Sequence, residues 1–279
     1  MRCRHADGRP RVPPLGGRDD PQFRRRPGAR PAGDRGAPLE SSRRRRKGAP
    51  LRTLAIVPVK TFATAKQRLG DALARGSRAS LAQAMFSDVL AALRHAKRVD
   101  AIAVVTSDYT AETLSLELAT VLPDDAQAGQ SDAAEIGIGH AIAAGYERAL
   151  LAPGDTPLID PGDIDLLLDR SARDGLAVAI VADRHGTGTN ALVLTPPDAL
   201  RPAFGPGSLA RHVAAAEAEG LPHRVEPCES LAHDVDTPDD LAALISALEH
   251  ARGGAQRTRG VLSQLERTGS LRALAAARS

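Results

Sequence analysis

Apolar and polar residues alternate along residues 51–248 in two kinds of pattern. Short runs of apolar residues bounded by turn residues predict buried strands, and apolar residues spaced three to four positions apart predict amphipathic helices. Strands are predicted at 51–59, 101–106, 120–122, 150–152, 176–182, 191–194 and 221–225. Helices are predicted at 80–96, 110–119, 136–146, 161–168, 209–219 and 238–248. This alternation is typical of a mixed, mostly parallel sheet with helices on both faces, which is an α/β fold.

One long polar segment interrupts this alternation. Residues 123–135 are polar and acidic and contain no apolar period. They predict a loop between a strand and the helix expected at 136–146, and such a loop could close over a ligand.

Composition separates the first fifty residues from the predicted sheet. Residues 1–50 carry fifteen Arg and Lys against five Asp and Glu, with many Pro and Gly. Such a segment buries too little apolar surface to offset its ordering entropy, so we expect a disordered, Arg-rich arm. The whole chain carries +3, which leaves about −7 for the remaining residues. The sequence therefore predicts three parts, namely the arm 1–50, an α/β domain 51–250 and a basic tail 251–279.

Several classes of protein are disfavoured by the same composition. No apolar stretch of ~18 residues exists, which argues against a membrane span, and the arm lacks the apolar core of a secretory signal, so we expect a cytoplasmic protein. Cys3 and Cys228 are too few and too distant for a disulfide framework. The run from Arg43 to Lys47 attracts polyanions of any sequence, so a polyanion-binding protein acting through the arm stays an alternative. The chain has four Phe, two Tyr and no Trp, and such a composition offers few stacking platforms for nucleic acid.

One carboxylate follows the strand expected at 150–152. The order of Pro153, Gly154, Asp155 and Pro157 after this strand predicts that Asp155 lies at the carboxyl end of the sheet. Ligands of open α/β sheets bind at that end, and a carboxylate there can hold a hard cation such as Mg²⁺ against a phosphate. The alternative is that Asp155 only caps a turn before Pro157.

Three basic residues lie within nine positions of the end of the first strand. They are Lys60, Lys66 and Arg68. We expect them to hold a triphosphate, with Arg68 as a planar fork and the two lysines as point charges. The segment has no Gly-x-x-x-x-Gly-Lys-Ser/Thr pattern and is therefore not a P-loop. The alternative is an ordinary solvated loop.

Two segments combine glycines with hydroxyl groups. Residues 183–190 contain two glycines, two threonines and an asparagine, and residues 204–208 read Phe-Gly-Pro-Gly-Ser before a predicted helix. Glycines let backbone N–H groups approach an anion and hydroxyls add donors, so both segments suit a phosphate or a carboxylate. The alternatives are a tight hairpin turn in the first segment and simple helix capping by Ser208 in the second.

Two aspartates precede the last helix of the predicted domain. The helix start at Thr237 and Pro238 is explained by capping and by the helix dipole. Asp234 and Asp236 stay outside that explanation. Alternate residues of an extended segment point in opposite directions, so only one of them should join Asp155 on a shared metal ion, and we favour Asp236.

Together these segments resemble one known family. The motifs that carry the resemblance are Lys66-Gln67-Arg68-Leu69, Pro153-Gly154-Asp155-Thr156-Pro157, Gly186-Thr187-Gly188-Thr189, Phe204-Gly205-Pro206-Gly207-Ser208 and Asp234-Val235-Asp236-Thr237-Pro238. Over about 51–248 the chain is similar to the 2-phospho-L-lactate guanylyltransferase family, including its phosphoenolpyruvate guanylyltransferase branch. The resemblance implies one GT-A-like, Rossmann-related domain that transfers GMP from GTP to the phosphate of a three-carbon acid during coenzyme F-420 synthesis.

The resemblance also implies roles for single residues. Thr189, Gly205 and Ser208 would bind the phosphorylated acid, and Asp155 and Asp236 would hold Mg²⁺. With the triphosphate assigned to Lys60, Lys66 and Arg68, the predicted catalytic residues are Asp155, Lys60 and Arg68. Members often carry an asparagine near the guanine at the position of Gly139, so this chain lacks that side-chain amide.

The chemistry implied by the resemblance needs no catalytic triad. The attacking phosphate oxygen is already anionic, so the protein has to align the reactants and neutralise charge that develops on the α-phosphoryl group. Phosphoenolpyruvate is the preferred acid and 2-phospho-L-lactate the alternative, while a sugar or molybdopterin nucleotidyltransferase of the same fold is a further enzyme alternative. The sequence leaves the oligomeric state open, a homodimer included.

Overall fold

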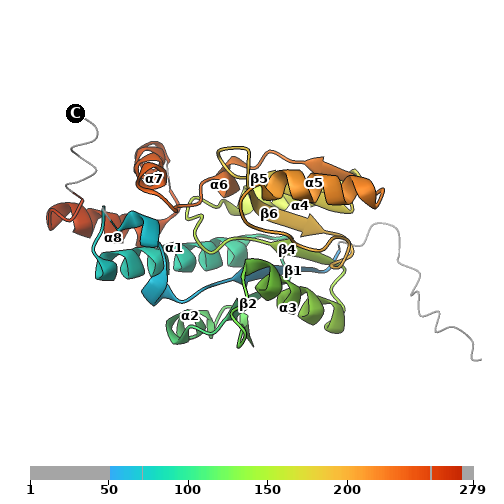
Figure 1. Ribbon diagram of the computed structural model, residues 1–279, viewed down its shortest axis with the longest axis horizontal. Coiled ribbons are helices and arrows are strands. Elements are labelled where there is room, and N and C mark those ends of the chain that lie inside the picture. The colour runs from blue at the N-terminus through green and yellow to red at the C-terminus, as the bar shows by residue number, and fades with distance from the viewer. Residues whose placement is uncertain (1–50, 71, 252, 272–279) are drawn as a thin grey trace, which may run out of the picture. The chain divides into compact units, whose positions relative to one another are not determined.

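The computed structural model describes residues 51–70, 72–251 and 253–271. These residues form a seven-stranded sheet with helices packed on both of its faces (Figure 1). The predicted arm 1–50 and the end of the predicted tail lie outside the described residues.

The sheet has the strand order β3-β2-β1-β4-β6-β5-β7. Its strands are β1 Thr53–Pro58, β2 Ala101–Thr106, β3 Thr120–Pro123, β4 Arg148–Leu151, β5 Val178–Ala182, β6 Thr189–Leu194 and β7 His223–Val225. β6 runs antiparallel to its neighbours β4 and β5, and the other pairs are parallel. The predicted mixed, mostly parallel sheet is therefore confirmed.

The helices divide between the two faces of the sheet. They are α1 Arg75–His95, α2 Tyr109–Ser115, α3 Gln130–Ala143, α4 Pro161–Arg173, α5 Ser208–Ala218, α6 Glu229–Ala232, α7 Pro238–His250 and α8 Gln256–Arg267. Two 3₁₀ turns, η1 Phe62–Thr64 and η2 Gln67–Leu69, follow β1. Among the described residues, no helix combines the length and apolar character that a membrane span requires.

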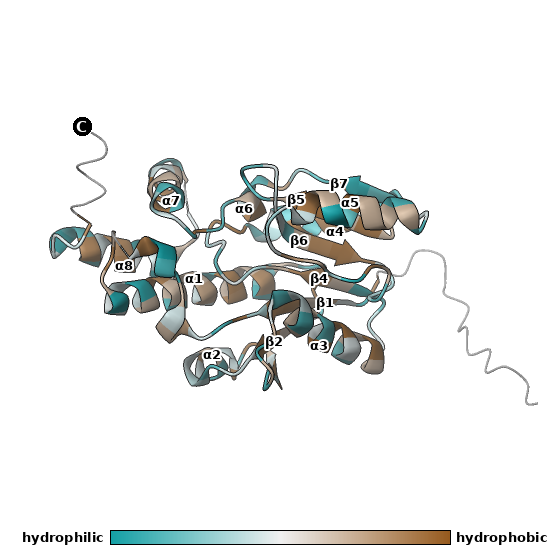
Figure 2. Ribbon diagram, in the orientation of Figure 1, coloured by the Kyte–Doolittle hydropathy of each residue, from teal (hydrophilic) through white to brown (hydrophobic). Residues whose placement is uncertain are grey.

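Alternate residues of the central strand β1 belong to two separate apolar clusters. Ala55 and Val57 of β1 pack in a cluster with apolar residues of α1 and α4, and Leu54 and Ile56 pack in a second cluster with α3 and α5. This is the period-two alternation of a strand that is buried on both faces. The apolar strands between more polar helix surfaces are visible in Figure 2.

Two elements differ from the sequence-based prediction. α3 begins at Gln130, six residues before the predicted start, because Gly129, with a φ of 149°, ends the loop early. The first turn of α3 is polar, so it has no apolar period to reveal it. The short helix α6 is absent from the prediction because a single four-residue turn has no periodic signal.

The helix α8 packs against α1, although the prediction assigned its residues to a tail. Asp88 of α1 accepts hydrogen bonds from the backbone N–H groups of Arg257 at 3.1 Å and Thr258 at 2.8 Å, and thereby caps the first turn of α8. Leu262 and Leu265 of α8 join a buried cluster with Leu81 of α1. The packed unit therefore extends past residue 250.

Strand direction brings the loops of interest to one edge of the sheet. β1 and β4 are parallel neighbours, so the segments that follow Pro58 and Leu151 leave the sheet at the same edge. β6 is antiparallel to β4, with Leu192 opposite Leu151, so its first residue, Thr189, lies at that edge too.

Candidate functional site

A lysine joins the two predicted metal ligands. Lys66 Nζ lies 2.9 Å from Oδ1 of Asp236 and also donates a short hydrogen bond to Oδ2 of Asp155. Both carboxylates therefore lie within the reach of one cation, and the structure brings the two predicted metal ligands together. The turn after Asp155 is closed by the N–H of Ile159 bonding to the carbonyl of Thr156 at 3.1 Å. Among the described residues, the Asp155 carboxylate accepts from Lys66 and from no backbone N–H group of this turn, so it does not cap the turn.

The ammonium group of Lys66 is held as a buried cation. Burial by itself would lower the pKa of Lys66, but the negative charges and hydrogen bonds of Asp155 and Asp236 outweigh it and raise the pKa above its usual value. The backbone of Lys66 has a φ of 57° and a ψ of 38°, a left-handed conformation that is uncommon outside glycine. The loop is thus bent so that this side chain points between the carboxylates.

A third aspartate stands close to this pair. Burial and the charges of Asp155 and Asp236 raise the pKa of Asp234 to about 6. Asp234 Oδ1 accepts a hydrogen bond from the side-chain amide of Asn190 at 3.1 Å. Asn190 follows Thr189 directly, so this bond links the predicted acid-binding segment to the predicted metal-binding segment.

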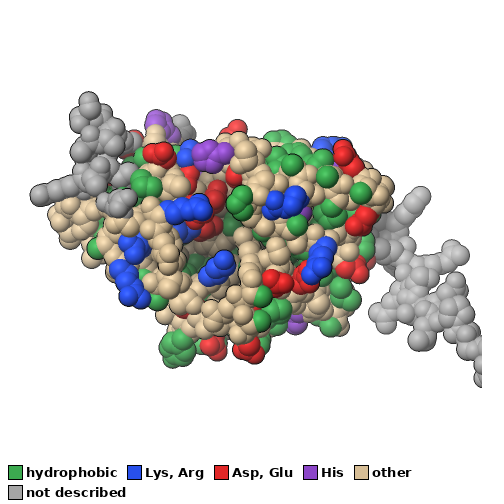
Figure 3. All heavy atoms as spheres, viewed as in Figure 1, with side chains coloured by type: hydrophobic (Ala, Val, Ile, Leu, Met, Phe, Trp, Pro, Cys, Tyr) green, Lys and Arg blue, Asp and Glu red, His purple; other side chains and the backbone are tan. Residues whose placement is uncertain are grey.

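A cavity of about 440 Å³ opens beside the carboxylates. Four predicted site residues line it, namely Lys60, Lys66, Asp155 and Asp236. Figure 3 shows this face of the molecule, with a hollow near its middle and basic and acidic side chains around it. The cavity brings cations from the loop after β1 together with carboxylates from two distant segments.

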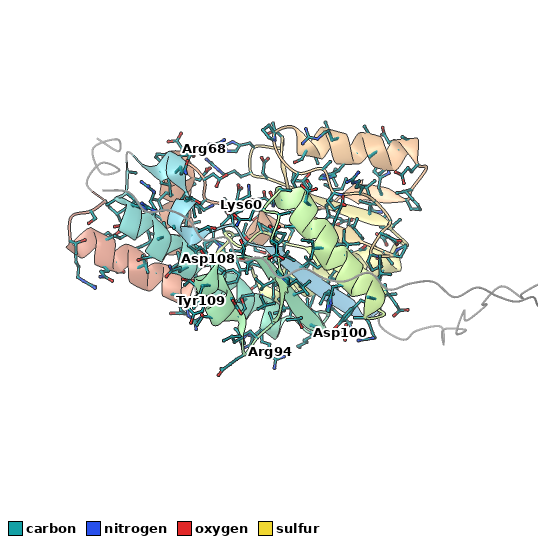
Figure 4. The ribbon with its side chains drawn as sticks, turned by 60° about the horizontal axis from the view of Figure 1, so that its bottom comes forward. Lys60, Arg68, Arg94, Asp100, Asp108 and Tyr109 are labelled. Atoms are coloured by element: carbon teal, nitrogen blue, oxygen red, sulfur yellow. The ribbon has the colours of Figure 1, made fainter. Side chains whose placement is uncertain are left out.

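The structure separates Arg68 from the two lysines. Arg68 lies on η2, is exposed and does not line the cavity. Figure 4 shows Arg68 and Asp108 on opposite sides of Lys60. Asp108 Oδ2 accepts a hydrogen bond from the N–H of Phe62 at 2.9 Å, which anchors the loop that carries the lysines.

The predicted acid-binding residues form a second cluster at the same edge. The backbone N–H of Thr189 donates to Oγ of Ser208 at 2.8 Å, although the two residues are nineteen positions apart. Thr189 and Ser208 are both buried, while Gly205 is exposed and has a φ of 110° that favours glycine. The structure therefore brings the two glycine-and-hydroxyl segments together.

Two details of these segments differ from the prediction. The N–H groups of Thr187 and Gly188 do not face outward, because they donate to the carboxylate of Asp183 at 2.9 Å each. Ser208 is not an N-cap, since Gly207, with a φ of 70°, occupies that position and the Ser208 hydroxyl turns inward to Thr189. The backbone N–H groups of residues 187 and 188 are therefore not free to bind a ligand.

An ion pair connects the acid-binding loop to the segment of Asp236. Arg184 Nε donates to Oδ1 of Asp240 at 2.7 Å. Oδ2 of Asp240 in turn accepts from the N–H groups of Asp236 at 3.1 Å and Thr237 at 2.8 Å. Thr237 and Asp240 form a reciprocal capping box, as the helix-start pattern predicted.

Some cavity residues were not identified from the sequence. They are Asp124, Gln127, Gly129 and Gln130, which line the cavity from the loop after β3 and from the first residue of α3. The polar composition of 123–135 was the available signal. Gly139, by contrast, is exposed on α3 and does not line this cavity. The asparagine that the family often carries at this position would therefore also lie outside the cavity.

A family model described as guanylyl transferase CofC like matches residues 53–273 of this chain. The chain belongs to this family. It is 48% identical over 217 residues to the phosphoenolpyruvate guanylyltransferase of Conexibacter woesei, covering 77% of this chain and 97% of the relative. It is 33% identical over 204 residues to the 2-phospho-L-lactate guanylyltransferase of Methanothermobacter thermautotrophicus, covering 72% of this chain and 89% of the relative.

Solved structures support the same fold. A protein from Desulfovibrio desulfuricans G20 named for nucleotide-diphospho-sugar transfer superposes with a TM-score of 0.64 at 17% identity, over 80% of this chain and 97% of its own. At this identity the likeness concerns the fold alone, which is the nucleotidyltransferase-like fold that the sequence predicted. With the family membership, it identifies the chain as a nucleotidyltransferase.

Proposed function

We propose that this protein transfers GMP from GTP to the phosphate of phosphoenolpyruvate during coenzyme F-420 synthesis. The products are enolpyruvoyl-diphospho-guanosine and pyrophosphate. The observation that carries the proposal is the convergence of Asp155 and Asp236 on one cation, Lys66 Nζ, in a cavity. The Thr189–Ser208 pair does not line this cavity but lies at the same edge of the sheet. The relative with 48% identity is named for phosphoenolpyruvate guanylyl transfer, which supports this choice of acid.

The donor atoms at the carboxylates fit a magnesium ion. Asp155 and Asp236 offer hard oxygen ligands, and both already bind a cation, the Lys66 ammonium. No group of three or more His, Cys, Asp or Glu able to hold a metal occurs in the described part of the chain. Mg²⁺ commonly binds through one or two carboxylates together with substrate phosphates and water, so two aspartates suffice. Such an ion would neutralise charge on the α-phosphoryl group.

The remaining work falls to the protein's own side chains. An oxygen of the acid's phosphate forms a bond to the α-phosphorus of GTP, and the bond from that phosphorus to the β-phosphate oxygen breaks, which releases pyrophosphate. Lys60 and Lys66 line the cavity and would bind the triphosphate. The Thr189 and Ser208 hydroxyls, with Gly205, would bind the acid. The contribution of these residues is alignment and charge neutralisation, without proton abstraction.

The cavity also supplies groups suited to a base. Gln127 and Gln130 line it, and each side-chain amide can both donate and accept hydrogen bonds. Guanine presents both donors and acceptors along its edge. We propose these two glutamines for base recognition, because Gly139, where the family often carries an asparagine, has no side-chain amide and does not line the cavity.

A direct assay tests the proposal. Purified protein is incubated with GTP, Mg²⁺ and either phosphoenolpyruvate or 2-phospho-L-lactate, and pyrophosphate release is measured. We expect release with phosphoenolpyruvate. Faster release with 2-phospho-L-lactate would favour the alternative acid, which the 33% identical relative supports by its name. Absence of release with both acids would overturn the assignment.

Other predictions from the sequence stay open. Polyanion binding by the Arg-rich arm concerns residues outside the described ones, and a cytoplasmic location and a homodimer stay predictions. Deletion of residues 1–49 separates the arm from the enzyme: pyrophosphate release should persist if the domain acts alone. Affinity for polyanions that falls with salt would be lost with the arm if the arm binds them.

A further inference from the structure

A buried histidine connects the three pieces of the predicted acid-binding cluster. His212 lies on α5, one turn after Ser208, and its side chain is wholly buried. Its Nε2 lies 2.8 Å from the backbone nitrogen of Ala203, and its Nδ1 lies 3.0 Å from Oγ1 of Thr189. The ring also packs edge-on against Phe204, with 5.5 Å between ring centroids. No feature of the proposed reaction described above uses this residue.

The hydrogen-bond partners determine which nitrogen carries the proton. A backbone N–H can only donate, so the N–H of Ala203 requires an unprotonated Nε2 on His212. A neutral imidazole then carries its hydrogen on Nδ1, which donates to Oγ1 of Thr189. Burial and the charge of the adjacent Arg211 lower the pKa of His212 to about 4, so the ring stays neutral near pH 7.

This arrangement fixes the direction of the Thr189 hydroxyl group. Oγ1 of Thr189 is engaged as an acceptor from His212, so its own hydrogen has to find another acceptor. Among the hydrogen bonds of the described residues, the Thr189 hydroxyl donates to no other protein group. The Ser208 hydroxyl likewise accepts one hydrogen bond, from the Thr189 N–H, and donates to no protein group among the described residues. Two adjacent hydroxyl hydrogens are therefore left for a ligand.

The histidine also holds the loop that carries Gly205. Ala203 lies two residues before Gly205, and its N–H bond to His212 fixes the start of that loop. Arg211 holds the same loop from the other side, since its guanidinium donates to the carbonyls of Ala203 and Phe204 at 3.0 and 3.3 Å. The His212 ring therefore bonds both to this loop and to Thr189.

We infer that His212 is a positioning residue, which orients the Thr189 hydroxyl as a hydrogen-bond donor to the phosphorylated acid and fixes the Gly205 loop beside it. This inference rests on the proposed function, because it takes Thr189 as a contact of the acid. His212 itself touches no substrate. Its loss should therefore affect binding of the acid and leave binding of GTP nearly unchanged.

Two substitutions separate the two bonds of the ring. His212→Gln can place an acceptor near the Nε2 position but no donor near Nδ1, whereas His212→Asn can keep a donor near Nδ1 and lose the bond to Ala203. We expect His212→Gln to raise KM for the acid about tenfold, as for loss of one buried hydrogen bond. KM for GTP and kcat should change less than about twofold. His212→Asn should recover part of the loss, and His250→Gln, at an exposed helix end, serves as the matched control.

A double-mutant cycle tests whether His212 acts through Thr189. Thr189→Val removes the acceptor, so adding His212→Gln to it should raise KM for the acid by less than about twofold further. Additive effects of the two substitutions would overturn the inference. So would an unchanged KM for the acid in His212→Gln, with wild-type protein active.

A measurement on the substrate-free wild-type protein keeps the inference testable if the variants do not fold. ¹⁵N NMR of the imidazole should show His212 protonated at Nδ1 and neutral down to about pH 5. Protonation at Nε2 would overturn the inference whatever the enzyme does. Wild-type protein that shows the Nδ1 tautomer but releases no pyrophosphate with either acid would instead overturn the proposed function.

Discussion

Asp155 and Asp236 lie on segments eighty-one positions apart in the chain and contact the same nitrogen atom, Nζ of Lys66. Asp155 follows β4, Asp236 precedes α7, and Lys66 comes from the loop after β1. A cation held between two carboxylates marks a place where positive charge is favoured. A divalent ion and this ammonium group would therefore compete for the same pair of oxygens.

Replacing Asp155 by asparagine should abolish turnover and preserve the fold. The substitution removes one of the two charged ligands and keeps the size of the side chain. We expect a loss of at least about a hundredfold in the rate of pyrophosphate release, which is on the order of 3 kcal/mol in the barrier. Asp198→Asn makes the same charge change at an exposed position and should retain activity. Substantial activity in Asp155→Asn would remove this residue from the proposed metal site.

Replacing Lys66 by methionine should increase the effect of magnesium on stability. Without its ammonium, the carboxylates of Asp155 and Asp236 lose their shared partner. Because both are partly exposed to water, we expect a cost of only about 1–2 kcal/mol in the free energy of unfolding in metal-free buffer. Mg²⁺ should then raise Tm more in the variant than in the wild type.

Thermal unfolding with and without Mg²⁺ measures this difference directly. Lys60→Met is the matched control, since Lys60 lines the cavity but forms no ion pair in the described part of the chain. An equal Mg²⁺-induced shift of Tm in wild type and Lys66→Met would mean that the ion and the lysine do not share the carboxylates.

The proximity of Asp155 and Asp236 could be predicted from the sequence. An apolar run that ends at Gly154 and Asp155 predicts a strand end, and the capping pattern at Thr237 leaves Asp236 unexplained by local structure. Strand ends of a parallel sheet meet at one edge, so the two carboxylates could be placed together. The position of Lys66 between them could not, because it depends on a left-handed backbone turn that no residue pattern indicates.

Protein stability should decrease in acid through His212. The folded-state pKa of about 4 lies below the usual histidine value of 6.5. Above pH 6.5 both states are neutral and the ring contributes no pH dependence. Between pH 6.5 and about 4 only the unfolded state binds the proton, so stability falls as the pH falls, by on the order of 3 kcal/mol in total.

Urea unfolding at pH 7, 5 and 4 tests this dependence. The difference in unfolding free energy between the wild type and His212→Gln should shrink over this range, because glutamine does not titrate. His250→Gln should leave the pH dependence of the wild type unchanged. A constant difference between wild type and His212→Gln from pH 7 to pH 4 would show that folding does not lower the pKa of His212.

Two glycines of α3 should respond oppositely to alanine. A Cβ at Gly137 would lie 2.3 Å from Cγ2 of Ile56, so α3 or the strand has to move. We expect Gly137→Ala to cost about 1–3 kcal/mol of stability. Gly139 has no atom within 4 Å of an added Cβ, so Gly139→Ala should stabilise the protein by about 0.5–1 kcal/mol.

Chemical denaturation of the two variants makes this comparison, and the assay adds a second readout. Because Gly139 does not line the cavity, Gly139→Ala should keep the wild-type preference for GTP over ATP. A changed preference in that variant would return this position to base recognition, as the family resemblance implied.

Residues that organise the site were harder to predict than residues at its surface. His212, Asp183 and Asp240 each act through bonds to segments that are distant or folded back, and each looks like an ordinary helix or turn residue in the sequence. A histidine on the inner face of a helix has no local pattern that distinguishes it from a core residue. Ser208, in contrast, has a local pattern that misleads. Its position before a helix predicts an N-cap, but its hydroxyl accepts from the distant Thr189 N–H.

The hydrogen bonds from the first turn of α8 to Asp88 hold this helix over the apolar surface of α1. Without α8, the Asp88 carboxylate would lose both of its N–H donors, and apolar side chains of α1 such as Leu81 would lose the leucines packed over them. A chain that ends before Gln256 would then expose an apolar surface on α1 beside the Asp88 carboxylate, which would have lost its hydrogen-bond donors. We expect such a shortened chain to aggregate, although it retains all the residues that line the cavity.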